Sequence, residues 1–133
     1  MQENILSGNL PSAPALAYIG DAAHSLYIRR MLVARGIRKS GELNELSLKY
    51  VTAENQAVAY SRIADQLTEL EQDIFRAAFN SGHLNKPKRA SGKDYRTATG
   101  FEAVIGLLVW LGMQDRFEAL MSLAHPDGGA VCK

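Results

Sequence analysis

The sequence predicts an all-α fold, and three observations predict it. Apolar residues recur at helical spacing along most of the chain, helix start and stop signals bound these segments, and no stretch alternates apolar and polar residues as a half-buried strand does. The chain of 133 residues, 47% hydrophobic and 22% charged, can bury a packed core and fits one domain over residues 1–133. The expected architecture is a bundle of helices.

The first helices follow from local signals. Residues 1–13 form a proline-containing lead-in that we expect to be flexible. A helix over about residues 14–35 comes next, because Pro14 suits a first helical turn and Gly36 suits a C-terminal stop. Ser40 can then cap a short helix that carries three leucines.

The middle of the chain holds two more helices and a long irregular segment. A third helix starts near Thr52. The pattern of Thr68 and Glu71 is that of a capping box, so a fourth helix starts there and ends near Asn80. Residues 81–95 contain two glycines, a proline and several bases, which is typical of a functional or a disordered loop.

The last third of the chain predicts the most buried helix. A fifth helix, from about Thr97 to Leu111, is apolar nearly all round, which favours a central position. After Gly112 a final helix runs to about Ala124, and we expect residues 125–133 to be a flexible tail. The longest apolar run in the chain, residues 104–113, is too short to span a bilayer.

Two acids lie inside these apolar helical segments: Asp21 in the first and Glu102 in the fifth. A lone buried carboxylate usually neutralises, pairs or binds a metal. Gly20 precedes Asp21, and Gly106 lies one turn after Glu102. Because glycine inside a helix costs about 1 kcal/mol relative to alanine, these glycines indicate a close backbone approach. The pattern predicts two helices that face each other across one metal site.

The types of ligand available limit which metals and reactions such a site can support. Oxygen ligands without a cysteine or histidine set favour Mg²⁺ or Mn²⁺ over zinc, as in a phosphodiesterase that uses metal-activated water. The alternative is that each acid forms a structural salt bridge with an arginine. His24 lies one turn from Asp21, where a packing or supporting role is expected. The aromatic residues of these segments are expected in the core: Tyr18, Tyr27, Phe101 and Trp110.

The bases are clustered although the net charge is only +1. Five lie within residues 29–39 without an acid, and five lie within residues 86–96 beside one acid, Asp94. Such clusters favour a polyanionic partner, and the alternative is that they are ordinary solvated faces. The candidate contacts of the second cluster are Lys86, Lys88, Arg89, Lys93 and Arg96. A single cysteine and the lack of a signal-peptide pattern favour a cytoplasmic location.

Residues 18–22, Tyr-Ile-Gly-Asp-Ala, resemble the signature helix of ribonuclease III catalytic domains, and residues 101–106, Phe-Glu-Ala-Val-Ile-Gly, resemble their second acidic motif. The similarity covers about residues 15–123 and is greatest to Mini-ribonuclease III, the short bacterial form without a double-stranded-RNA-binding domain. The full-length family has two further acids, and Ala17 and Thr99 stand at those positions here, as in the Mini form.

The resemblance implies a homodimeric, helical endoribonuclease that cleaves double-stranded RNA with Mg²⁺, or with Mn²⁺ in its place, and leaves 5′-phosphate and 3′-hydroxyl ends. It implies that Asp21 and Glu102 are the metal-binding catalytic acids and that the 86–96 cluster contacts RNA. The Mini form matures large-subunit (23S) ribosomal RNA precursors, and a ribosomal protein that presents the RNA is a further expected partner. Two alternatives are a non-catalytic RNA-binding module of this fold and a helical adaptor without an RNA role.

Overall fold

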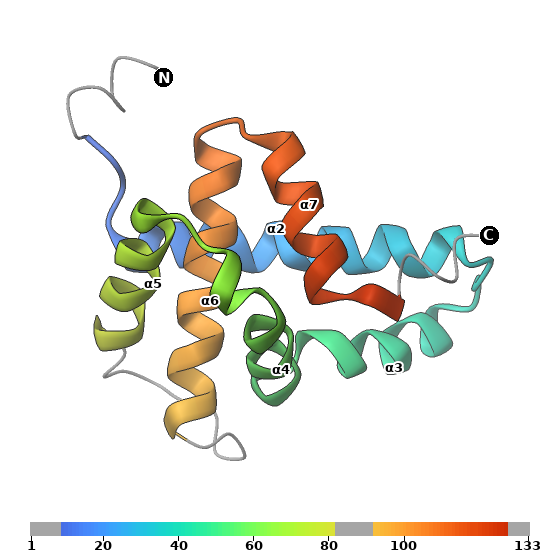
Figure 1. Cartoon of the computed structure of the whole chain (residues 1–133). Helices are drawn as coiled ribbons and strands as arrows, with labels where there is room; N and C mark the ends of the chain where they lie inside the picture. The colour runs from blue at the N-terminus through green and yellow to red at the C-terminus, as the bar shows by residue number, and fades with distance from the viewer. Residues whose placement is uncertain (1–8, 82–91, 128–133) are drawn as a thin grey trace.

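The computed structural model describes residues 9–81 and 92–127, and every regular element within those ranges is helical (Figure 1). The predicted all-α fold is confirmed. The elements are α2 (Ala13–Ala34), α3 (Ser40–Val51), α4 (Ala53–Ile63), the short 3₁₀ helix η1 (Ala64–Gln66), α5 (Glu69–Ser81), α6 (Gly92–Trp110) and α7 (Gln114–Ala124). No helix in the described part of the chain is long and apolar enough to cross a membrane.

Most helix ends form where the local signals predict them. Ser12 caps α2, because its Oγ accepts a hydrogen bond from the backbone N of Ala15 at 3.2 Å. Gly36 follows this helix with a φ of 94°, a left-handed conformation that glycine adopts at little cost. The capping box is reciprocal: Glu71 Oε1 accepts from Thr68 N at 2.9 Å, and Thr68 Oγ1 accepts from Glu71 N at 3.2 Å.

Two helix starts differ from the prediction. Ser40 is the first residue of α3 rather than its cap, and the N-cap is Lys39, which makes no side-chain capping hydrogen bond. Helix α6 begins at Gly92 rather than at Thr97. Glycine is a poor helix former, so local propensity conceals this start, and packing of α5 against α6 supports the extra turn. Residues 82–91, the rest of the predicted irregular segment, lie outside the described residues.

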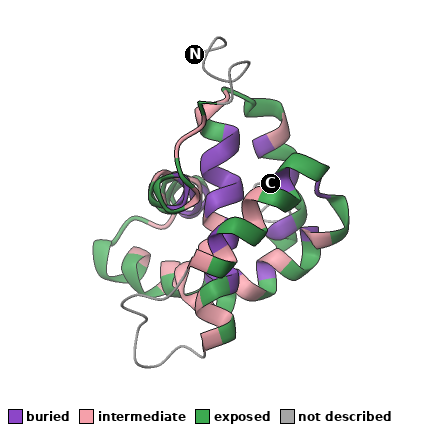
Figure 2. Cartoon of the chain, turned by 90° about the vertical axis from the view of Figure 1, so that its left-hand side faces the viewer, coloured by how far each residue is buried: buried purple, intermediate pink, exposed green. Residues whose placement is uncertain are grey.

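Helix α6 is the central element. Its interface with α2 is the largest in the described part of the chain, and α4, α5 and α7 also pack against it (Figure 1). Between Thr97 and Leu108 nearly every residue of α6 is buried, so its predicted central position is confirmed. Figure 2 shows buried positions gathered where the helices face one another and exposed positions on the outward faces.

Helices α2 and α6 cross in backbone contact at two glycines. A Cβ on Gly20 would overlap the carbonyl O of Glu102 and lie 2.9 Å from Gly106 N. A Cβ on Gly106 would overlap the carbonyl O of Leu16 and lie 3.1 Å from Gly20 N. The predicted close approach is therefore confirmed, and it places residue 21 of one helix beside residue 102 of the other.

Two side chains are buried to a different extent from what the sequence suggests. Tyr18 is 83% exposed on α2, although Phe101 is fully buried in the core as predicted. His125 begins the predicted flexible tail, yet it is only 2% exposed. Its ring lies among those of Tyr27, Tyr50 and Phe101, and burial of this aromatic cluster draws the chain back onto the core after α7. Residues 128–133 lie outside the described residues.

Candidate active site

Asp21 and Glu102 meet at the crossing of α2 and α6, where their carboxyl groups are close enough to shift the pKa of Glu102. Glu102 is partly buried, but Asp21 is exposed, so the expectation that both acids are enclosed in the interior is wrong for Asp21. Helical periodicity does not account for this exposure, since Ala17, His24 and Ile28 lie on the same face of α2 as Asp21 and are buried. The pair is thus accessible from solvent on the Asp21 side.

The electrostatics of the pair favour a cation. Burial, then the charge of Asp21 and the hydrogen bond to it, raise the pKa of Glu102 to about 8, against the opposing effect of a hydrogen bond from Gln56. Without a cation, Glu102 therefore keeps its proton at neutral pH. A divalent ion beside both carboxyl groups would remove their repulsion and displace this proton.

The structure offers neither acid an arginine within the described ranges. The side-chain ion pairs found there join Arg76 to Asp73 and Arg116 to Glu71. The alternative in which each acid forms a structural salt bridge thus finds no support among residues 9–81 and 92–127. An acid pair without a basic partner leaves the charge of Asp21 available to a ligand.

The donor set fits Mg²⁺ better than zinc. Among the described residues, no group of three or more His, Cys, Asp or Glu side chains is arranged to hold a metal, as a zinc site would require. Mg²⁺ commonly takes one or two carboxylates and keeps several waters. Ala17 and Thr99, which replace the further acids of full-length ribonuclease III, contribute no carboxylate, and Thr99 Oγ1 donates to the Tyr95 carbonyl O at 3.0 Å. The site therefore offers two carboxylates.

Gln56 of α4 completes the site, although the sequence patterns above do not identify it. Its Nε2 donates to Glu102 Oε2 at 3.1 Å, and the residue is only 2% exposed. A signal was available, because Gln56, Ala59 and Ile63 are the buried face of α4 at helical spacing, and a glutamine on such a face needs a partner.

His24 lies behind the acid pair and contacts Gln56 rather than either acid, which fits the packing or supporting role expected from the sequence. Its Nδ1 lies 3.1 Å from Gln56 Nε2, and its Nε2 lies 2.9 Å from Nε2 of His125. Both rings are buried. Burial, reinforced by the neighbouring His125, lowers the pKa of His24 to about 3, and burial lowers the pKa of His125 to about 4. Both rings are therefore neutral at physiological pH.

The predicted RNA-contacting bases fall into two groups. Lys86, Lys88 and Arg89 lie outside the described residues. Lys93 and Arg96 are exposed on the first turns of α6, where the Arg96 guanidinium lies 5.9 Å from the centre of the Phe79 ring. Both bases thus stand on the same helix as Glu102, toward its N-terminal end.

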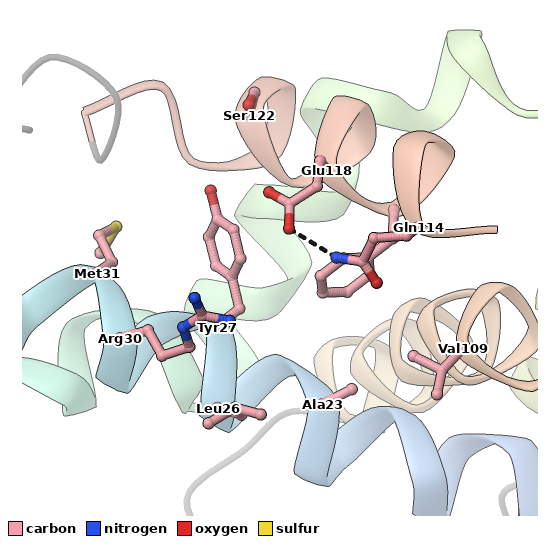
Figure 3. A pocket seen from close by; sticks show the side chains of 10 residues that line it. Ala23, Leu26, Tyr27, Arg30, Met31, Val109, Gln114, Glu118 and Ser122 are labelled. Carbon is pink, nitrogen blue, oxygen red and sulfur yellow. Dashed lines mark hydrogen bonds between the residues drawn. The ribbon is translucent and has the colours of Figure 1, made fainter. Parts of the chain in front are cut away.

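A groove on the described surface does not include the acid pair. It lies between α2 and α7, beside Val109 of α6, and has a volume of about 590 Å³ (Figure 3). Leu26, Tyr27 and Met31 line it from α2, and Gln114 donates to Glu118 at 2.8 Å on the α7 side. The rest of the lining is mixed, because Arg30 and Ser122 lie among the apolar side chains, so the lining by itself favours neither a protein surface nor a phosphate.

Comparisons with known proteins concern the family of the chain. The family model described as "Ribonuclease III domain" matches residues 14–111. A Streptococcus pneumoniae protein named Mini-ribonuclease 3 is 40% identical over 116 residues, covering 86% of this chain and 91% of that protein. A Thermoanaerobacter protein of the same name is 41% identical over 109 residues, covering 82% of this chain and 77% of that protein.

A solved structure shows the same fold. The crystal structure of a Fusobacterium nucleatum protein superposes with a TM-score of 0.80 at 27% identity, covering 87% of this chain and 93% of that one. The fold and these relatives define a helical nuclease domain. The chain belongs to the ribonuclease III family of endoribonucleases, and its relatives of similar extent are Mini-ribonucleases.

Proposed function

We propose that this chain is a Mg²⁺-dependent endoribonuclease that cleaves double-stranded or structured RNA, with Asp21 and Glu102 as its metal-binding catalytic acids. The observation that carries the proposal is the pair itself: two carboxyl groups that interact with each other, without a basic partner in the described ranges, where the backbones of two helices cross. Mn²⁺ has the same preference for oxygen ligands and is expected to substitute.

The chain's own residues would position the ion and the substrate. Asp21 and Glu102 would hold Mg²⁺, which when bound would supply a Lewis acid and an activated water for phosphodiester hydrolysis. Gln56 holds one oxygen of Glu102 through its amide N–H, which limits the orientations of that carboxylate. The exposure of Asp21 leaves room for a phosphate to approach from solvent. Hydrolysis of this class gives 5′-phosphate and 3′-hydroxyl ends.

A homodimer is part of the proposal, and the outer face of α2 supports it. Tyr18, Leu26 and Val33 follow one another at about two turns each and are 83%, 58% and 58% exposed. The opposite face of α2 is buried against α6, so this helix is apolar on both sides, as helices at interfaces are. A two-fold dimer would offer one acid pair to each strand of a duplex.

The expected substrate is a large-subunit (23S) ribosomal RNA precursor in the cytoplasm. Duplex RNA is recognised mainly through its phosphates, its 2′-hydroxyls and its shape, which basic side chains can contact without reading sequence. The proposed contacts are Lys86, Lys88, Arg89, Lys93 and Arg96. A ribosomal protein that presents the precursor would offset the modest affinity of so small a basic surface.

The acid assignment is tested with two isosteric variants. Asp21→Asn and Glu102→Gln should each reduce cleavage of duplex RNA by about a thousandfold or more, since metal-assisted charge stabilisation contributes several kcal/mol. Duplex binding and circular dichroism should stay as in the wild type, which separates lost chemistry from lost fold. Turnover retained in either variant would remove that acid from the site.

A further inference from the structure

A chain of buried hydrogen bonds runs inward from the acid pair. Glu102 Oε2 accepts from Gln56 Nε2 at 3.1 Å, the same nitrogen lies 3.1 Å from His24 Nδ1, and His24 Nε2 lies 2.9 Å from His125 Nε2. The chain connects α6, α4, α2 and the segment after α7. His24, Gln56 and His125 are each at most 2% exposed, so water does not compete for these contacts.

The contacts dictate where the protons lie. Both hydrogens of the Gln56 amide group sit on Nε2, so this nitrogen donates to Glu102 and to His24, and His24 Nδ1 must be bare to accept. A neutral His24 ring then carries its proton on Nε2. That proton points at His125, whose Nε2 must be bare and whose own proton must be on Nδ1.

We propose that His24 and His125 are positioning residues for Glu102, because His125 fixes the tautomer of His24, and that tautomer holds Gln56 in the orientation that donates to Glu102 Oε2. This proposal rests on the proposed function, because a fixed orientation of the Glu102 carboxylate matters only if that carboxylate binds a metal.

The opposite tautomer shows what the arrangement prevents. A proton on His24 Nδ1 would face the Gln56 amide N–H, and two donors would then point at each other. Gln56 could relieve this only by turning its amide, which would place its carbonyl O against Glu102 Oε2 and, once Glu102 is ionised as a metal ligand, remove the hydrogen bond there. A proton more than one side chain away thus decides how the carboxylate is held.

The proton positions can be measured directly in metal-free protein. Nitrogen-15 NMR of labelled histidine side chains distinguishes bare from protonated ring nitrogens. The proposal predicts His24 with its proton on Nε2 and His125 with its proton on Nδ1 at pH 7. A His24 ring with its proton on Nδ1, or with both nitrogens protonated, would overturn the proposal.

Matched variants test the consequence for the site. His125→Leu removes the acceptor for His24 Nε2–H, whereas His125→Gln offers an amide oxygen in its place. Calorimetric titration of the metal-free proteins with Mn²⁺ should show an affinity about tenfold weaker for His125→Leu and within about threefold of wild type for His125→Gln. Equal weakening by both variants, or by neither while both remain folded, would contradict the positioning role.

The same logic applies one residue nearer the site. His24→Asn keeps an acceptor near the place of Nδ1, whereas His24→Leu removes it. Only His24→Leu should therefore bind Mn²⁺ about tenfold more weakly than the wild type. Failure of the proposed function gives a different result. If Glu102→Gln binds Mn²⁺ and cleaves RNA like the wild type, the acid assignment falls, whereas the histidine tautomers of the wild type remain as the contacts dictate.

Discussion

At the scale of the residue, the site depends on one carboxyl group held in an unfavourable state. Glu102 is partly buried beside the charge of Asp21, and these surroundings raise its pKa to about 8. Active sites commonly contain such groups, because the cost of holding them is recovered when the ligand binds. A structural acid would instead have been paired, as Glu71 is with Arg116, where hydrogen bonds lower the pKa of the carboxyl.

This state of Glu102 predicts a pH-dependent stability. A carboxyl whose folded pKa is raised from 4.5 to about 8 contributes its full stability below the unfolded pKa, and that stability is lost as pH rises through the folded pKa. Without metal, Glu102→Gln should therefore be more stable than the wild type at pH 9, by an amount on the order of a few kcal/mol, and close to it at pH 5.

Thermal unfolding in EDTA at the two pH values measures this difference. A stability gap that is the same at pH 5 and pH 9 would show that Glu102 titrates normally. Mg²⁺ serves as a control, because it should raise the melting temperature of the wild type but not that of Glu102→Gln.

At the scale of the element, the crossing of α2 and α6 determines where the acids stand. Gly20 and Gly106 let the two backbones touch, and a side chain at either position would collide with a carbonyl group of the other helix. The acids are brought together by this contact, since they come from helices far apart in the sequence. The glycines are thus part of the site although they carry no chemistry.

Alanine at the crossing should separate the helices. Gly106→Ala is expected to destabilise the protein by at least about 3 kcal/mol, because the added methyl group meets backbone that cannot move aside cheaply. Gly41→Ala is the matched control, since nothing lies within 4 Å of its added Cβ on α3, and it should stabilise the protein by about 0.5 kcal/mol. Urea unfolding measures the change in the free energy of unfolding of each variant. The same change in both variants would contradict the close crossing.

Local signals predicted the elements better than the contacts between them. A few neighbouring residues suffice to predict the caps at Thr68 and Gly36, the apolar periodicity of α6 and the close approach at the two glycines beside acids. The structure confirms each of these predictions. The contacts of Gln56 and His125 cannot be predicted from neighbouring residues. Gln56 reaches an acid 46 positions away, and His125 reaches His24 across 101 positions, so only tertiary packing brings these partners together.

At the scale of the whole molecule, the surface carries two features that the helical core does not need. One is the outward apolar face of α2 with the groove beside it, which supports a second copy of the chain. The other is the basic cluster that ends on the first turns of α6, which supports a nucleic-acid partner. The acid pair connects these two features, because a dimer bound to a duplex would use one acid pair for each strand.

The dimer is tested by a charge on the outer face of α2. Leu26→Lys should convert the protein to a monomer in sedimentation velocity, because a lysine would be placed in an apolar contact. Leu48→Lys is a close control, since Leu48 of α3 is 56% exposed against 58% for Leu26, and this variant should remain dimeric. A dimer that survives Leu26→Lys would move the interface to another face.

The basic cluster is tested through the salt dependence of RNA binding. Neutralising Lys86, Lys88 and Arg89 together should weaken duplex binding and reduce the slope of log affinity against log salt by up to about three. Unchanged affinity and slope would move the RNA-contacting surface elsewhere, and the exposed bases Arg29, Arg30, Arg38 and Lys39 would be the next candidates.

The central claim is that Asp21 and Glu102 form the metal site of an RNA-cleaving enzyme. Its most direct test is cleavage of a long perfect RNA duplex by the purified protein in Mg²⁺ and in EDTA, beside Glu102→Gln. The account predicts cutting by the wild type in Mg²⁺, and none in EDTA or by the variant. Cutting that persists in EDTA or in Glu102→Gln, or a wild type that binds the duplex and leaves it intact in Mg²⁺, would contradict it.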